Sequence, residues 1–167
     1  GQLVSGVLWL AAAALATWST PRAAITALVV GGFFIFPLTE LLLRIGSDAR
    51  PLSAANDLRH LGMQVAFVLP LSMPLLLPVG LYRLDWFFPA MMVLLGAHYL
   101  PFVFLYGMRM FAVLTALLVG GGVAIARIGP GTLGLGAWYT GATLLLFSAI
   151  GRLIVHREAR LQGVHAA

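Results

Sequence analysis

Long apolar runs, separated by short polar breaks that each contain an arginine, make up most of this chain. A helix needs roughly 20 apolar residues to cross the hydrocarbon core of a bilayer, and six of the runs come close to that length. The pattern therefore predicts an all-α membrane protein, a six-transmembrane-helix bundle formed by the whole chain as a single domain. The helices are expected at about residues 3–18, 23–45, 61–82, 86–108, 110–126 and 133–150.

The composition supports a membrane protein rather than a soluble one. Hydrophobic residues make up 61% of the chain, charged residues make up 9%, and the mean hydropathy is +1.00. A soluble domain cannot hide that much apolar surface, because its exterior needs many polar residues. The lipid bilayer is therefore the expected main partner. The chain is apolar from Leu3 onward, and we expect its native start to lie upstream of Gly1.

The placement of the arginines predicts the orientation, because cytoplasmic loops are enriched in basic residues. With six spans, the loops after spans two and four lie on the same side as the C-terminal tail. That side carries Arg44, Arg50, Arg59, Arg109, Arg152, Arg157 and Arg160, whereas the other side carries Arg22, Arg83 and Arg127. Trp18, Trp86 and Trp138 fall at span ends on the second side, as an interfacial aromatic belt does. Both termini are therefore expected to be cytoplasmic.

All ten basic residues are arginine, and lysine is absent, which is typical of a GC-rich bacterial genome. The expected location is therefore the bacterial inner membrane. The arginines are scattered among the loops and form no basic face, so nucleic acid is not an expected partner.

The sequence contains no motif that names a reaction. Cysteine is absent, which excludes disulfides and thiolate metal sites, and neither H-E-x-x-H nor G-x-S-x-G occurs. His60 and His98 lie at different depths and do not suit a haem. We therefore expect no metal and no cofactor, and a non-enzymatic role is favoured over an enzymatic one.

Glu40 is the most informative single residue. It lies about one turn above the expected cytoplasmic end of the second span, and Arg44 follows four residues later on the same helical face. Two interpretations stay open, a structural ion pair within one helix and a functional carboxylate. Because a carboxylate facing lipid is costly, we expect Glu40 to point into the bundle. Its expected partners there are Gln64, Tyr99, Tyr106 or Arg109.

His98 is the second candidate, since it lies near the middle of the fourth span. It either bonds a carbonyl that Pro101 leaves free or serves as a proton-carrying or ligand-binding group. Its span is also the one with the most polar residues. The candidate binding residues are Glu40, Arg44, Gln64, His98, Tyr99, Tyr106 and Arg109.

Asp57, His60 and Gln64 recur at helical spacing before the third span. They form either a cluster at the cytoplasmic mouth or, as we favour, an amphipathic segment at the lipid headgroups.

Prolines and glycines predict where the helices bend or approach closely. Pro70, Pro74 and Pro78 each remove an amide donor from one stripe of the third span, so we expect a departure from ideal helix there. The run Gly120–Gly122 indicates close helix approach or flexibility, and Ala137 with Gly141 is a small-xxx-small pair.

Several short segments resemble a family of small bacterial multi-pass membrane proteins of unknown function. They are Gly6 with Trp9, Pro37-Leu38-Thr39-Glu40, and His98-Tyr99-Leu100-Pro101 leading to Tyr106-Gly107-Met108. The resemblance spans nearly the whole chain. It implies a six-helix bundle and supplies no catalytic residue.

Three functions compete on this evidence. The first is binding or transport of a small molecule or proton through a cytoplasm-facing polar cavity lined by Glu40 and His98. The second is an intramembrane enzyme that acts on a lipid, with His98 as acid or base. The third is a structural or accessory subunit without a site of its own. A small-molecule or lipid ligand and a homo-oligomer are both compatible with the sequence.

Overall fold

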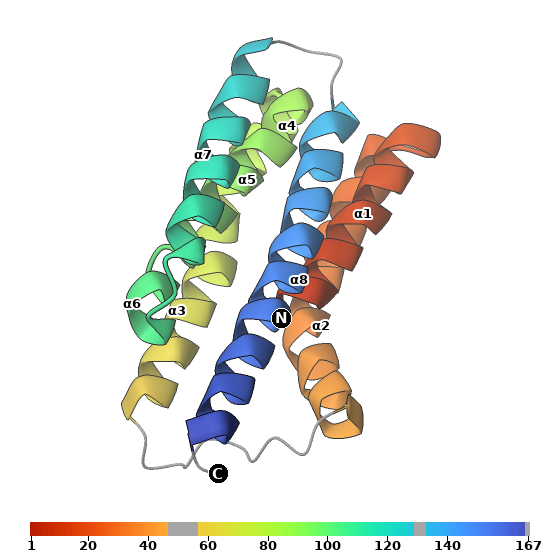
Figure 1. Cartoon of the computed structure of the whole chain (residues 1–167). Helices are drawn as coiled ribbons and strands as arrows, with labels where there is room; N and C mark the ends of the chain where they lie inside the picture. The colour runs from red at the N-terminus through yellow and green to blue at the C-terminus, as the bar shows by residue number, and fades with distance from the viewer. Residues whose placement is uncertain (47–56, 129–132, 166–167) are drawn as a thin grey trace.

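A computed structural model describes residues 1–46, 57–128 and 133–165, and these residues are almost entirely helical (Figure 1). No strand occurs among them, so the predicted all-helical class is confirmed. The α-helices are α1 (Gln2–Trp18), α2 (Pro21–Gly46), α3 (Asp57–Ser72), α4 (Leu76–Tyr82), α5 (Phe87–Tyr99), α6 (Phe102–Tyr106), α7 (Met110–Ile128) and α8 (Leu133–His165). Two 3-10 turns, η1 (Met73–Leu75) and η2 (Leu84–Trp86), lie before α4 and α5.

Four helical segments are long and apolar enough to cross a membrane. They are Pro21–Leu43, Leu84–Tyr106, Met110–Ile128 and Leu133–Val155. The other two expected spans correspond to shorter apolar helices, Gln2–Trp18 and Phe67–Tyr82. The last helix runs well past the expected end at residue 150, because its apolar half is followed by a polar helical extension.

The third expected span departs from regular α-helix between Pro70 and Pro78, as predicted. The α-helical pattern ends at Ser72, changes to the 3-10 turn η1, and resumes at Leu76. Pro70, Pro74 and Pro78 are all exposed, so the bend lies on the outer side of the bundle. The tighter turn reflects the amide donors that the prolines lack.

Pro101 and Gly107 interrupt the fourth expected span in a way that the pattern of apolar residues did not reveal. Pro101 separates α5 from α6, and Gly107 ends α6 in the left-handed conformation, with φ of 66°. A residue with a side chain is strained at that φ, whereas glycine is not. The chain thereby turns directly into α7.

Two antiparallel helix pairs hold the bundle together at glycines. In the α1–α8 pair, Gly6 faces Leu145 and Gly141 faces Leu10, so the predicted small-residue contact on α8 is real. In the α5–α7 pair, the Thr115 hydroxyl donates to the carbonyl of Gly96 at 2.9 Å. Close packing of small residues is the main source of helix association in lipid, where no hydrophobic driving force exists between helices.

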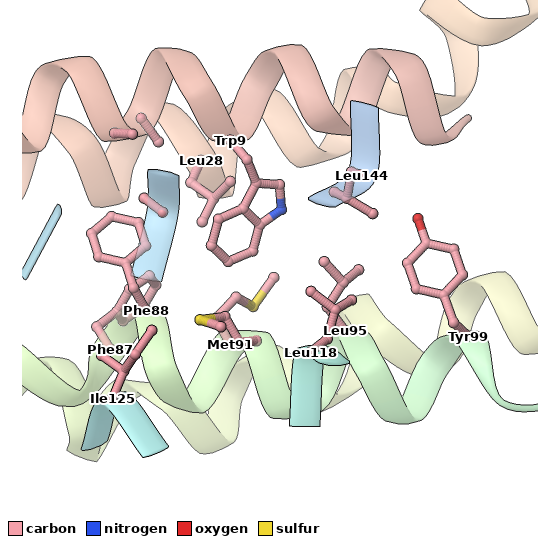
Figure 2. Close-up of a cluster of buried hydrophobic side chains, with 14 of the residues drawn as sticks. Trp9, Leu28, Phe87, Phe88, Met91, Leu95, Tyr99, Leu118, Ile125 and Leu144 are labelled. Carbon is pink, nitrogen blue, oxygen red and sulfur yellow. The ribbon is translucent and has the colours of Figure 1, made fainter. Parts of the chain in front are cut away.

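The core lies between these two pairs and is almost wholly apolar (Figure 2). Trp9 of α1 packs on Phe88 of α5 with ring centroids 6.0 Å apart. Among the described residues, Ser5 and Thr140 are the buried polar or charged residues. The described part of the bundle is therefore filled mainly by hydrocarbon and aromatic side chains.

Candidate functional site

The end of the bundle where α1 finishes and α8 begins carries three tryptophans, and we call it the tryptophan end. Trp18 meets Trp138 edge to face at 5.9 Å, and the Trp138 indole donates to the Thr17 hydroxyl at 3.1 Å. Nearby, the guanidinium of Arg83 lies 5.1 Å from the Trp86 ring and forms a 3.2 Å ion pair with Asp85. Tryptophan rings and charged groups at one end are what a membrane–water interface favours.

An aromatic cluster joins α5, α6 and the start of α7, toward the end of the bundle opposite the tryptophans. The His98 ring contacts Tyr99 at 5.6 Å and Phe102 at 5.3 Å. Phe102 stacks on Tyr106 at 5.5 Å, and Phe111 of α7 lies against the rings of Tyr99, Phe102 and Tyr106. The cluster therefore brings together three of the predicted site residues, His98, Tyr99 and Tyr106.

His98 is half-buried, and its Nδ1 atom is buried without a hydrogen-bond partner among the described residues. The ring also lies at the backbone of Val65 in α3. The structural role considered for this histidine was a bond to the carbonyl that Pro101 frees, which is that of Ala97. That carbonyl instead accepts the amide of Leu100 at 3.2 Å, so the proline-freed group is satisfied without His98.

Tyr99 points the other way, into the core. Only 8% of its surface is exposed, and Figure 2 shows its hydroxyl directed from α5 toward α1, beyond Trp9 and Leu144. The hydroxyl makes no hydrogen bond within the described part of the chain. The sequence singled out Tyr99 for its neighbour His98, whereas the structure shows that its own hydroxyl is the notable group.

Two further polar residues on α1 were missed by the sequence analysis. The Nε2 atom of Gln2 is buried and has no hydrogen-bond partner among the described residues, and Ser5, one turn later, is 5% exposed. A polar residue near the start of an apolar run looks like a simple helix end, so nothing in the pattern marked them. Their spacing of three residues, which places both on one helical face, was the available signal.

Glu40 does not point into the bundle, so that expectation is wrong. It is exposed on α2, and no hydrogen bond or ion pair joins it to another residue whose side chain is described. The physical reason is that most described side chains in the second half of α2 are exposed, so this part of the helix offers few inner positions. The placement of the Arg44 side chain lies outside the described part, which leaves the predicted Glu40–Arg44 pair untested.

The remaining predicted residues lie on the outside of the described bundle. Gln64, Tyr106 and Arg109 are exposed, and of these three Tyr106 alone belongs to the aromatic cluster that contains His98. The side chains of Asp57 and His60 lie outside the described part. No group of histidine, aspartate and glutamate that suits a metal ion occurs among the described residues. The buried atoms without a partner, Nδ1 of His98 and Nε2 of Gln2, are thus the best candidates for binding among the described residues.

Comparison with known proteins identifies the class of this chain and leaves its activity open. Residues 1–154 match the family described as "Family of unknown function (DUF7010)", and the chain belongs to that family. No curated protein and no solved structure matches the chain. The expected kinship with an uncharacterised family over nearly the whole chain is therefore confirmed.

Proposed function

We propose that this protein is a six-span protein of the bacterial inner membrane, with both termini in the cytoplasm, that binds or carries a small molecule or a proton at His98. One observation carries this proposal, the buried Nδ1 atom of His98 without a partner in the described residues. Leaving a buried polar atom unpaired costs about 1–3 kcal/mol, and an apolar side chain in the same place would avoid that cost. An ionisable side chain inside a membrane protein is therefore a functional candidate by default.

The surroundings of His98 fit this role. The aromatic rings of Tyr99 and Phe102 and the backbone of Val65 in α3 lie against the half-buried imidazole. The ordinary pKa of an imidazole lies near neutrality, which suits reversible proton binding. Glu40 has no part in this proposal, because it is exposed on a different helix.

Replacing His98 with leucine tests the proposal. We expect a small molecule to copurify with the wild-type protein in mild detergent and to be lost from His98→Leu, as measured by native mass spectrometry. If the bound species is a proton, wild-type proteoliposomes should dissipate an imposed pH gradient faster than His98→Leu proteoliposomes. The melting temperature of His98→Leu should be no lower than that of wild type, because leucine leaves no unpaired nitrogen.

The matched control is Ala97→Leu, which adds the same side chain at the exposed neighbouring position. It should keep both the copurifying molecule and the proton flux. Identical adducts and identical fluxes in wild type and His98→Leu would refute a role for His98 in binding.

The topology can be tested separately. A reporter that works only in the cytoplasm should be active when it is fused after Ala167, because the arginine-rich loops and the tail are retained on the cytoplasmic side. A reporter that works only in the periplasm should be inactive at the same position. A fusion in the loop after Trp18 should show the opposite behaviour. Activity of the Ala167 fusion in the periplasm alone would overturn the proposed orientation.

A second candidate function, an accessory membrane subunit, is favoured by α2. Only 6% of the most apolar stretch of this helix is buried, the lowest share among the four candidate spans. The second half of α2 exposes large apolar side chains on every face. Such a helix suits contact with lipid or with another membrane protein. This function needs no internal site, so the experiment on His98 distinguishes it from the first.

A further inference from the structure

One side of α2 carries exposed side chains at positions that are alternately four and three residues apart. They are Thr26, Val30, Phe33, Pro37 and Glu40, and we call them the outer stripe. This spacing places all five on one side of the helix, as in the contact stripe of two supercoiled helices. The outer stripe is therefore a continuous helix surface that no other described part of the chain covers.

The opposite side of α2 is the one that packs inside the protein. Ala24 and Leu28 are buried there, and Gly31 lies against Leu8 of α1. Ala24 and Leu28 each lie two residues before a member of the outer stripe, which corresponds to a rotation of about 200° around a helix. The outer stripe therefore faces away from α1 and from the core.

The outer stripe is not a purely apolar surface, because it includes a carboxylate. Glu40 lies inside the candidate span Pro21–Leu43, and no hydrogen bond or ion pair joins it to another residue whose side chain is described. Ionisable side chains within membrane spans are almost always paired, or they face protein or water rather than lipid. An exposed carboxylate in this stripe therefore favours a polar partner from outside this copy of the chain.

We propose that the outer stripe is the contact surface of a homodimer, in which α2 packs parallel to α2 of a second copy around a two-fold axis. Two copies in one membrane have the same orientation, so equal positions meet at equal depth. Arg44 follows Glu40 by four residues on the same side of the helix, so the acid of each copy comes within about one turn of the base of the other. A two-fold interface needs such a self-complementary surface, and this need selects a second copy over an unrelated protein.

This inference rests on the second candidate function, contact of α2 with another membrane protein, and it names that partner. It also needs the proposed membrane location, but it does not depend on His98. Carbonate extraction of the same membranes keeps the two questions apart. A monomeric protein that resists extraction would overturn the dimer and leave the membrane location intact, whereas release by carbonate would overturn both.

Single cysteines test the contact directly, since the chain has no cysteine of its own. Val30→Cys and Phe33→Cys should form disulfide-linked dimers when membranes are treated with copper phenanthroline, because each residue meets its own counterpart near the two-fold axis. The matched control is Leu42→Cys, since Leu42 is 50% exposed, as Val30 is, but lies on the same side of α2 as Ala24. Equal dimer formation at all three positions, or none at any of them, would overturn the proposal.

Charge reversal separates pairing between copies from pairing within one helix. Glu40→Arg and Arg44→Glu each place like charges across the interface, so each variant alone should dimerise roughly fivefold more weakly, because a two-fold dimer loses two ion pairs. When the two variants are coexpressed with different tags, we expect them to form a mixed dimer of nearly wild-type strength. The measurement is the amount of one tagged copy that is retained with the other on affinity resin.

Pairing within one helix predicts no such recovery, because each variant carries like charges in its own α2 whichever copy lies beside it. Mixed dimers as weak as those of the separate variants would therefore refute the proposed interface. Thr20→Ala in both coexpressed copies is a neutral reference, since residue 20 precedes α2 and lies outside the outer stripe. It should leave the amount of retained protein unchanged.

Discussion

Replacing Gly122 with alanine should loosen the bundle, whereas the same replacement at Gly120 should not. A Cβ atom at Gly122 would lie 2.8 Å from the carbonyl oxygen of Pro89 and 3.2 Å from the Cβ of Met92. The first of these is a backbone atom that cannot rotate away, so α5 and α7 must separate. At Gly120 the same Cβ meets nothing within 4 Å.

The two effects have opposite signs. Alanine is the better helix former by about 1 kcal/mol, so Gly120→Ala should be neutral or stabilising by up to that amount. At Gly122 this gain is outweighed by overpacking, which typically costs about 1–3 kcal/mol. The separation would also strain the bond from the Thr115 hydroxyl to the Gly96 carbonyl in the same interface. Gly122→Leu should be worse and should fail to accumulate as folded protein.

Unfolding titrations of the purified variants in mixed SDS–maltoside micelles measure these changes. Gly121→Ala provides an intermediate case, because its Cβ would meet the Tyr139 ring at 2.8 Å rather than backbone. That ring can shift at the cost of the bond from its hydroxyl to the Leu117 carbonyl. We expect the destabilisation to rise from residue 120 to 121 to 122. Equal stability of the Gly120 and Gly122 variants would show that α5 and α7 do not pack as described.

The features of the fold that have a strong sequence pattern could be predicted, and those with a weak pattern could not. Apolar runs of helical length indicated where the helices lie, and the spacing of Pro70, Pro74 and Pro78 predicted a departure from regular helix, which the structure shows as the 3-10 turn at Met73–Leu75. Both signals are local, because a missing amide acts within its own turn. The break at Gly107 was missed, since one glycine among apolar residues does not reveal whether its φ is positive.

The site was less predictable, because burial depends on how the helices pack. Glu40 was expected to point into the bundle because a carboxylate that faces lipid is costly. That cost calls for polar surroundings, but it does not require the side chain to point inward. An acid close to a helix end can reach the interface instead. Trp9 and Phe88 lie 79 positions apart in the sequence, and only the packing of the helices brings their rings together.

The second large effect is expected for Trp9→Ala. Trp9 is 2% exposed and lies in the core, where its ring contacts that of Phe88 on α5. Truncating a buried tryptophan costs about 3–5 kcal/mol in soluble cores. Lipid is as apolar as the core, so the share that comes from transfer to water is small here. The lost packing contacts remain, and we expect a cost of about 3 kcal/mol, at the lower end of that range.

Phe104→Ala is the control for this prediction, since it also truncates an aromatic side chain but one that is 89% exposed on α6. Its effect on the free energy of unfolding should stay within about 0.5 kcal/mol. Unfolding in mixed micelles, followed by far-UV circular dichroism so that the readout does not depend on tryptophan, compares the two variants directly. If Trp9→Ala were no less stable than Phe104→Ala, the tryptophan would not be part of a packed core.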